Sequence, residues 1–504
     1  MNLLIVLALC LGAVESYKFL VAVPLTVRSL NILGEGIVRH LLNAGHEVTF
    51  VTGYPKKDNK NPKLRQIDIS KNLELLQAQD ELNIAYLMET DALVNDDFYI
   101  QNLTVETARM TLQNENVQAL LKNPKEQFDA VIIDWFDTDL YAGLASVFNT
   151  HLIWSYSIGP YWQILRLIDE PSNPAYSING MSAYTPPLSF LERLDELCAQ
   201  MNWAFLKSRE KEIYYTYLGP AAALRGRTIP DYEDAIFNAT LVVSNAHHAI
   251  GGWPKTPQNF KFVGGFHIDD PPKPLPALMD NAPHGIIYFS MGSTWKSKDI
   301  PKHVTKNLVK LFGRLKQTVI WKYEEDLPNK PKNLHIIKWA PQTSILGKHL
   351  YLIQNYYSSS LMESIHFGVP AIGIPIYYDQ FHNVNKAVNS GYALKVDLSM
   401  DMPAKLEIAI QEMLPNSSYT QKAKELSMKY HDRPAKPGVE LVHWIEHVVK
   451  TNGAPHLRSP ALHVPVYQKL YLDLVTLVLL IAIIVIWLLK KIFTKNVKKH
   501  GKTD

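Results

Sequence analysis

Residues 17–52 read YKFLVAVPLTVRSLNILGEGIVRHLLNAGHEVTFVT, and the spacing of their apolar residues changes twice within this stretch. Tyr17 to Val23 is apolar and rich in strand-forming residues, as in a buried strand. Residues 29–43 carry leucine and isoleucine at helical spacing, and Ala44-Gly45-His46 ends that helix before a second strand at 48–52. Strand, helix and strand in this order predict the first unit of a doubly wound parallel sheet.

Short apolar runs in the rest of the chain continue this pattern. Residues 129–134 and 151–154 indicate further buried parallel strands, and a proline-rich stretch at 269–276 indicates a linker. After the linker the alternation restarts, with strands expected at 285–290, 318–322, 334–338, 352–355 and 371–375. The predicted fold class is therefore α/β, with two facing, Rossmann-like, doubly wound domains.

The two ends of the chain carry targeting signals. Residues 3–14 are almost wholly apolar, and Val14-Glu15-Ser16 offers small residues where a signal peptide is cleaved. The first residues lack Lys and Arg, so a buried first helix is the alternative. Residues 474–489 contain no charge and 470–472 extend this run, which is enough for a transmembrane helix of roughly 20 residues. Lysines follow at once, and the positive-inside rule makes that tail cytosolic.

These features divide the chain into consecutive segments. The predicted boundaries are a signal peptide (1–16), a first α/β domain (17–268), a linker (269–282), a second α/β domain (283–450), a juxtamembrane segment (451–469), a transmembrane helix (470–489) and a cytosolic lysine-rich tail (490–504). The body between signal and anchor is expected to be lumenal.

Charge and motif content exclude several functional classes. The chain has 51 Lys+Arg against 48 Asp+Glu in 504 residues, which leaves no electrostatic footprint for nucleic acid. A nicotinamide-binding site needs a glycine-rich turn directly after the first strand, but Gly34 and Gly36 lie inside the helix and Arg39 stands at the third glycine position. No metal-ligand spacing is visible in the sequence, so no metal is expected.

Cysteines and sequons fit a secretory compartment only weakly. Cys10 would leave with the signal peptide, so Cys198 alone remains and no intrachain disulfide can form. Asn102, Asn238 and Asn416 each begin an Asn-x-Ser/Thr triplet and are candidates for N-glycosylation.

The second half carries an ordered series of short motifs. They are Phe289-Ser290-Met291-Gly292-Ser293, Trp339-Ala340-Pro341-Gln342, Glu363 through Pro370, Asp379-Gln380 with Asn383, Asp432-Arg433-Pro434, and Gly453 through Arg458. This series resembles the signature of the UDP-glycosyltransferase family, and in particular its UDP-glucuronosyltransferases of the animal, insect-like, membrane-anchored type. The resemblance covers essentially the whole mature chain and implies the GT-B arrangement of two facing domains.

The first two motifs could hold a nucleotide diphosphate. Ser290, Gly292 and Ser293 lie on a turn expected between a strand and a helix, where hydroxyls and backbone N–H groups can bind pyrophosphate. Trp339 offers a flat face for stacking on uracil, and Gln342 offers an amide for its edge. The alternatives are an ordinary helix cap for the serines and core packing for the tryptophan.

The later motifs could hold the two sugars. Glu363 can accept hydrogen bonds from both ribose hydroxyls, and Asp379-Gln380 suits the hydroxyls of a transferred hexose. A solvated glutamate and a capping aspartate are the alternatives. The resemblance favours ligand binding for Trp339 and Gln342 as well as for these three residues.

The chain departs from the family at the position of the general base. The family's histidine, counted back from Gly45-His46 along the first helix, should stand at position 30, where this chain has Leu30. The aspartate that orients this base is matched by Asp134, at the end of a predicted strand. A solvent-exposed aspartate at a strand end is the alternative for Asp134.

A second departure falls on the donor phosphates. The family's His-Gly-Gly aligns with Asn355-Tyr356-Tyr357, and two tyrosine rings could fill the phosphate space. Asn355 can still donate a hydrogen bond, and Ser360, in the serine run that follows, matches a family position.

The resemblance implies an inverting transfer of a hexosyl group, from UDP-glucose or UDP-glucuronate as co-substrate, to a small lipophilic acceptor, without cofactor or metal. Without a histidine base the activity could be impaired. The alternative is a catalytically inactive relative that binds UDP or small molecules, or that pairs with active transferases as a homo- or hetero-oligomer. The expected location is the endoplasmic reticulum membrane, as a single-pass type I protein.

Overall fold

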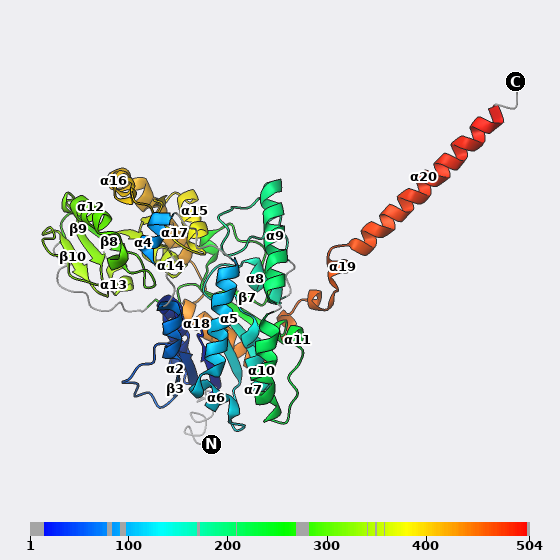
Figure 1. The fold of residues 1–504 in the computed structure, drawn as a ribbon, viewed down its shortest axis with the longest axis horizontal. Coiled ribbons are helices and arrows are strands. Elements are labelled where there is room, and N and C mark those ends of the chain that lie inside the picture. The colour runs from blue at the N-terminus through cyan, green and yellow to red at the C-terminus, as the bar shows by residue number, and fades with distance from the viewer. Residues whose placement is uncertain are drawn as a thin grey trace, which may run out of the picture.

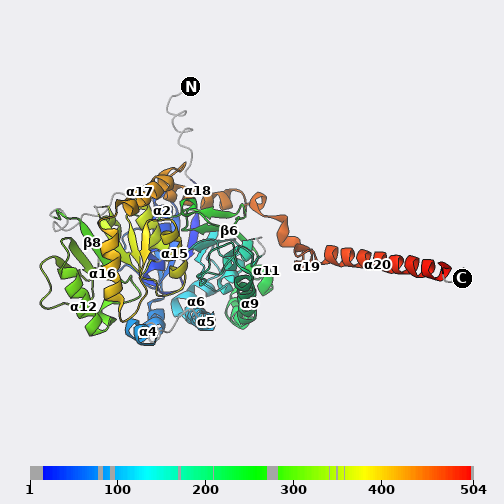
Figure 2. The same ribbon diagram turned by 90° about the horizontal axis from the view of Figure 1, so that it is seen from above.

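The computed structural model describes residues 15–77, 83–90, 97–168, 172–207, 209–268, 282–339, 341–347, 350–356 and 358–500. Most of the expected signal peptide and linker lie outside these ranges, as do Ala340 and Tyr357 of the sequence motifs. Figures 1 and 2 show two α/β bodies side by side, with one long helix, α20, extending away from them.

The first domain is built on a seven-stranded, all-parallel sheet in the order β3-β2-β1-β4-β5-β6-β7. Its strands are β1 (Lys18–Ala22), β2 (Glu47–Thr52), β3 (Leu64–Asp68), β4 (Ala130–Asp134), β5 (His151–Tyr156), β6 (Ala239–Ser244) and β7 (Phe260–Phe262). Its helices are α2 (Arg28–Asn43), α3 (Leu73–Gln77), α4 (Ile84–Thr90), α5 (Asp97–Gln113), α6 (Glu115–Lys122), α7 (Gly143–Phe148), α8 (Trp162–Leu165), α9 (Phe190–Lys207), α10 (Glu210–Ala223) and α11 (Tyr232–Ile236).

The second domain has a six-stranded, all-parallel sheet in the order β10-β9-β8-β11-β12-β13. Its strands are β8 (Ile286–Ser290), β9 (Thr318–Lys322), β10 (Leu334–Ile337), β11 (Leu350–Gln354), β12 (Ala371–Gly373) and β13 (Ala393–Lys395). The helices of this half are α12 (Lys302–Gly313), α13 (Gln342–Leu346), α14 (Ser358–Phe367), α15 (Gln380–Asn389), α16 (Met402–Met413), α17 (Ser417–His431), α18 (Pro437–Lys450), α19 (Val466–Lys469) and α20 (Leu472–His500).

The predicted fold class is confirmed: both halves are doubly wound α/β structures with parallel strands. Alternate residues of each strand face opposite layers of helices, since side chains of a strand point to its two faces in turn. In β1, for example, Leu20 packs with α5 and α7, whereas Phe19 and Val21 pack with α2. Strands β3, β6, β7 and β13 were not predicted. Strand β3 gives no apolar signal because it is a polar edge strand, LRQID, with no fully buried residue.

The chain returns to the first domain after completing the second. Helix α18 was assigned by sequence position to the second domain (283–450), but its buried residues Leu441, Ile445 and Val448 belong to the core of the first sheet. The buried His46 at the end of α2 lies opposite Glu446 of α18, with 3.0 Å between Nε2 and Oε1. A helical pattern shows that one face is buried, but not which sheet buries it.

Helix α20 extends away from both domains (Figures 1 and 2). It contains the stretch Leu472–Ile492, which is long and apolar enough to cross a bilayer and whose apolar side chains are exposed. This span begins two residues after and ends three residues after the predicted one (470–489). Of the predicted sequons, Asn238 and Asn416 are exposed and Asn102 is half-buried.

We predict that Ile445→Ala lowers the free energy of unfolding by roughly 2–5 kcal/mol, because the shortened side chain leaves a cavity in the first domain's core. Urea-induced unfolding of the full-length protein in detergent measures this. Val439→Ala is the matched control, since Val439 lies on the same helix with its side chain in solvent. An effect no larger than that of the control would contradict the packing of α18.

Candidate functional site

The carboxyl ends of both sheets face the gap between the domains, where ligands of such sheets bind. A polar cleft of about 380 Å³ lies there. Both domains supply its walls: Arg28, Ser29, Ile32, Glu35, Arg39 and His267 from the first, and Tyr288, Ser290, Gly292, Ser293, Lys322, Trp339, Pro341, Gln342, Thr343, Gln354, Ser359, Ser360 and Glu363 from the second.

A hydrogen-bonded cluster forms the second-domain wall of this cleft. Gln342, the first residue of α13, donates from Nε2 to Oε2 of Glu363 at 2.5 Å and to Oγ of Ser360 at 3.2 Å. Gln354, at the end of β11, donates in turn to Oε1 of Gln342 at 3.2 Å. The two residues expected to hold uracil and ribose are therefore hydrogen-bonded to each other.

The first domain reaches this cluster through His267. This buried histidine follows β7, and its Nε2 lies 3.3 Å from Oε1 of Glu363, across the domain gap. Its neighbour Phe266 is held by its carbonyl oxygen, which accepts from Nη2 of Arg39 at 3.1 Å. Glu363 is thus contacted from both domains.

Trp339 stands at the mouth of the cleft with 53% of its surface exposed. Two cations flank its ring: the guanidinium of Arg28 lies 5.9 Å and the ammonium of Lys322 lies 5.8 Å from the ring centroid. An exposed indole is unusual for so large an apolar group, and the core-packing alternative for Trp339 does not hold. Its face is available for a planar ligand.

The turn after β8 brings backbone and amide groups together. Gly292 has φ +80°, its N–H donates to Oγ of Ser290 at 3.1 Å, and a Cβ placed on it would lie 2.8 Å from Nδ2 of Asn355. Among the described residues, neither amide atom of Asn355 nor the hydroxyl of Ser293 has a hydrogen-bond partner, although all are buried. The turn does not open a helix as expected, because α12 begins only at Lys302.

Tyr356 does not occupy the space predicted for phosphates. Its φ of +63° is in the left-handed region that favours glycine, as the family's glycine at this position would allow. Its ring is fully buried in the core of the second domain, where the hydroxyl lies 2.7 Å from Oγ of Ser364 and donates to the hydroxyl of Tyr392. The expectation for Tyr357 lies outside the described residues.

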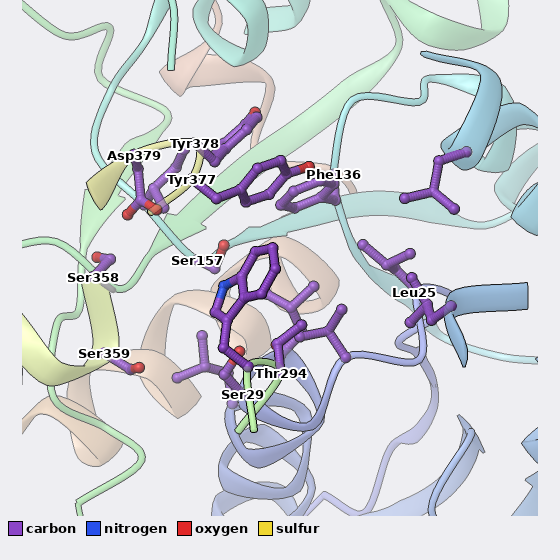
Figure 3. Close-up of a pocket in the computed structure, with 17 residues that line it drawn as sticks. Leu25, Ser29, Phe136, Ser157, Thr294, Ser358, Ser359, Tyr377, Tyr378 and Asp379 are labelled. Carbon is purple, nitrogen blue, oxygen red and sulfur yellow. The ribbon is translucent and has the colours of Figure 1, made fainter. Parts of the chain in front are cut away.

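Figure 3 shows a second, apolar pocket, which adjoins the polar cleft. The two share Ser29 and Ser359 as lining residues. Leu30 lies in the wall of this pocket, at the position expected for the general base. The remaining walls are mostly apolar: Leu25, Val27, Leu33, Leu76, Leu103, Phe136, Ser157, Ile158, Thr294, Trp295, Ser358, Tyr377, Tyr378 and Asp379.

Asp379 is the one carboxylate among the described residues that line the apolar pocket. It precedes α15, accepts from Nδ2 of Asn383 at 2.6 Å, and burial raises its pKa to about 7. It does not cap α15 with its side chain. The neighbouring Gln380 is fully buried, and its Oε1 accepts from the backbone N–H of Ile376 at 2.8 Å.

Asp134 lies outside both cavities. It ends β4 and lines a small void of about 10 Å³ together with Leu25 and Phe136, which also border the apolar pocket. Burial raises the pKa of Asp134 well above its ordinary value, and its Oδ2 has no hydrogen-bond partner in the described part of the chain. The solvent-exposed alternative for Asp134 is therefore wrong, since the carboxyl is buried.

The structure thus gathers most of the predicted site. Seven predicted residues line the polar cleft: Ser290, Gly292, Ser293, Trp339, Gln342, Ser360 and Glu363. The other cleft residues were missed, among them Arg28, Arg39, His267 and Lys322. Lys322 could have been found, because it ends a predicted strand. His267 gave no such signal, because β7 before it was not predicted. No cluster of three or more potential metal ligands occurs among the described residues.

Comparisons with known proteins agree with this geometry. A family model described as "UDP-glucoronosyl and UDP-glucosyl transferase" matches residues 21–504. The chain is 29% identical over 467 residues to UDP-glucosyltransferase 2 of Dactylopius coccus, covering 89% of this chain and 87% of the relative. It is 28% identical over 390 residues to UDP-glucuronosyltransferase 2B1 of Rattus norvegicus, covering 75% of this chain and 72% of the relative.

Solved structures share the fold at low sequence identity. One is a complex of a UDP-glucosyltransferase from Polygonum tinctorium capable of glucosylating indoxyl, with a TM-score of 0.56 at 13% identity, covering 87% of this chain and all of that one. Another is the spinosyn forosaminyltransferase SpnP, with a TM-score of 0.55 at 16% identity, covering 86% of this chain and all of that one. Both have the GT-B arrangement that the sequence predicted.

Proposed function

This chain belongs to the UDP-glucuronosyl and UDP-glucosyl transferase family, and from that premise we propose that it transfers a neutral hexosyl group from a UDP-sugar to a small apolar acceptor. One observation carries the proposal: a polar cleft built by both domains opens, past Ser29 and Ser359, into an apolar pocket. A charged nucleotide and a lipophilic acceptor can therefore lie end to end.

The nucleoside half of the donor fits the cluster around Glu363. In this proposal uracil stacks on Trp339, and Gln342 turns its amide from Glu363 to the edge of the base. Glu363 then accepts from the ribose hydroxyls, with His267 beside it. Stacking a base on an aromatic ring contributes roughly 1–3 kcal/mol.

The diphosphate fits the turn after β8. Ser290, Ser293 and the amide of Asn355, which has no partner among the described residues, offer donors around Gly292, where a side chain would block close approach. Lys322 and Arg39 line the same cleft and can balance the phosphate charges. Asn355 takes the place of the family's histidine in this arrangement.

In this proposal the hexose lies where the polar cleft joins the apolar pocket, beside Asp379, and the lining of that pocket favours glucose over glucuronate. Asp379 lies in it and suits sugar hydroxyls, whereas no Arg, Lys or His occurs among its described lining residues. A glucuronate carboxylate would be buried near a second carboxyl group without a cation, which is costly. The name of the relative from Dactylopius coccus, a glucosyltransferase, is consistent with this preference.

Deprotonation of the acceptor is the step that this site is expected to catalyse least well. Leu30 cannot take a proton, and burial raises the pKa of Asp134, whose Oδ2 accepts no hydrogen bond from any residue that the structure describes. Loss of a general base slows a reaction by about 10²–10⁴-fold without forbidding it. We therefore propose acceptors that ionise readily by themselves, such as acidic phenols, and inversion at the anomeric carbon.

Leu30 also favours a second candidate function. A chain that keeps the nucleotide cleft and the apolar pocket but has no base could serve as a binding protein for UDP or small apolar molecules. It could equally serve as a partner of active transferases. The Leu30→His experiment below separates these functions from catalysis.

We also propose that α20 anchors the protein in the endoplasmic reticulum membrane, with the two domains in the lumen. The lysines that follow the apolar stretch support this orientation. Asn238 and Asn416, which are exposed, would then be accessible for glycosylation.

We predict that Trp339→Ala and Glu363→Ala each weaken UDP binding by roughly 1–3 kcal/mol, through lost stacking and lost polar contacts. Calorimetric titration of the full-length protein with UDP measures this. The controls are Lys338→Ala, the exposed neighbour of Trp339, and Glu407→Ala on α16. If both site variants bind UDP as tightly as wild type, the uridine site lies elsewhere.

We predict that Leu30→His raises product formation from UDP-glucose and a phenol by an order of magnitude or more, detected by mass spectrometry. The new histidine would face the pocket near Asp134, which can favour the imidazolium formed on proton abstraction. The structure argues against adding Tyr356→Gly, because that change would empty a core position.

The matched controls are Leu33→His, one helical turn further along the same pocket wall, and Leu30→His combined with Asp134→Asn. Neither should show the gain. Binding of UDP without product in Leu30→His, across a broad panel of phenols, would contradict the proposed transfer and favour the binding function.

A further inference from the structure

Helix α9 (Phe190–Lys207) presents apolar side chains to solvent. Phe190, Leu191, Leu194, Leu197, Met201 and Phe205 are between 43% and 76% exposed. Most follow one another at intervals of three or four residues, so they form one continuous row along the helix. We call this row the outer face of α9.

The opposite face of α9 is held to the domain by polar contacts. Glu196, fully buried, accepts from the backbone N–H of Asn179 at 3.1 Å and from Nε1 of Trp162 at 3.4 Å. Near the C-terminal end, Lys207 donates to Oε1 of Glu210 at 2.7 Å. A surface helix of a soluble protein normally turns its apolar stripe to the core. Here buried charges fix the helix with that stripe outward.

The path to α20 leaves the first domain beside α9. Arg458 donates from Nη2 to the carbonyl oxygen of Phe237 at 2.8 Å. The guanidinium of Arg166 lies between that segment and α9, 6.0 Å from the ring of Phe237 and 4.0 Å from the ring of Trp203 on α9. Figures 1 and 2 both show α9 at the end of the molecule from which α19 and α20 depart.

This attachment limits how far the bilayer can be from α9. Only 13 residues lie between Arg458 and Leu472, where α20 begins, and the 14 steps along the chain span at most roughly 50 Å when fully extended. Short helical turns at Pro460–His463 and Val466–Lys469 shorten that path further. The outer face of α9 is therefore tethered within reach of the membrane surface.

We propose that the outer face of α9 lies in the interfacial layer of the same bilayer that α20 spans, as a second membrane contact. This inference rests on the anchoring proposed above. Exposed contiguous apolar surface marks a membrane or protein contact. A stripe on an 18-residue helix, roughly 27 Å long and roughly 10 Å wide, offers roughly 300 Å². A stable protein interface needs about 800 Å² from each partner, so a second copy of the chain is the poorer occupant.

The test places nitroxide labels on the full chain, in a background with Cys10→Ser and Cys198→Ser, reconstituted in phosphatidylcholine vesicles. Leu194→Cys and Met201→Cys probe the outer face of α9, Ile483→Cys probes α20, and Lys422→Cys on α17 is the exposed control. Each labelled chain must first keep the unfolding midpoint of the background. Collision rates with oxygen, which concentrates in lipid, are compared with those of a water-soluble nickel chelate.

We expect labels at Leu194 and Met201 to favour oxygen over nickel several-fold, as at Ile483, and the Lys422 label to favour nickel. Nickel access at both α9 labels equal to that at Lys422, with Ile483 in lipid, would overturn the α9 contact but leave the anchoring intact. A water-exposed Ile483 label would overturn the anchoring and the shared bilayer with it. Dipolar broadening between α9 labels that unlabelled protein dilutes away would identify a second copy as the occupant and also overturn the proposal.

Discussion

The return of α18 to the first sheet is the contact on which the rest of the structure depends. Ile445 and its neighbours on α18 are buried in the core of the first domain, so the chain is attached to the first sheet both before and after it builds the second domain. Just before α18, Tyr430 and Arg433 both donate to the carbonyl oxygen of Gly264, at 3.0 and 3.1 Å. These bonds fix the segment that carries His267, and His267 then reaches Glu363 in the other domain. The chain thus passes between the two domains twice, and each domain supplies one wall of the cleft.

The two halves of that cleft differ in chemistry. The nucleotide half is polar, and its unpartnered groups, such as the amide of Asn355, are arranged around a glycine that lets a ligand approach. The acceptor half is apolar, and Leu30 extends the apolar wall to the point where proton abstraction is expected. Burial keeps the pKa of Asp134 high. Binding of the donor and activation of the acceptor therefore rest on separate parts of the site, and substitutions can affect one without the other.

The sequence predicted the secondary-structure elements and motifs better than the contacts between distant segments of the chain. Apolar runs located β1, β4 and β5 because parallel strands are buried on both faces, whereas the polar edge strand β3 gave no such signal and the buried strand β6 was missed despite its apolar run. Motif order located Trp339 and Glu363, but it could not show His267 beside Glu363, since that contact joins segments almost 100 residues apart. The identity of residue 356 alone also led to a wrong expectation about where the side chain of Tyr356 lies. A tyrosine seemed too large for the phosphate space, yet the left-handed backbone turns its ring into the core.

Hydrogen–deuterium exchange of the full-length protein with and without UDP tests most directly whether one nucleotide is held by both domains. The account predicts that UDP slows exchange in four segments together: the start of α2 around Arg28, the segment around His267, and the second-domain segments from Ser290 to Ser293 and from Gln342 to Glu363. Slower exchange confined to the second domain, or none in any of these segments, would contradict it.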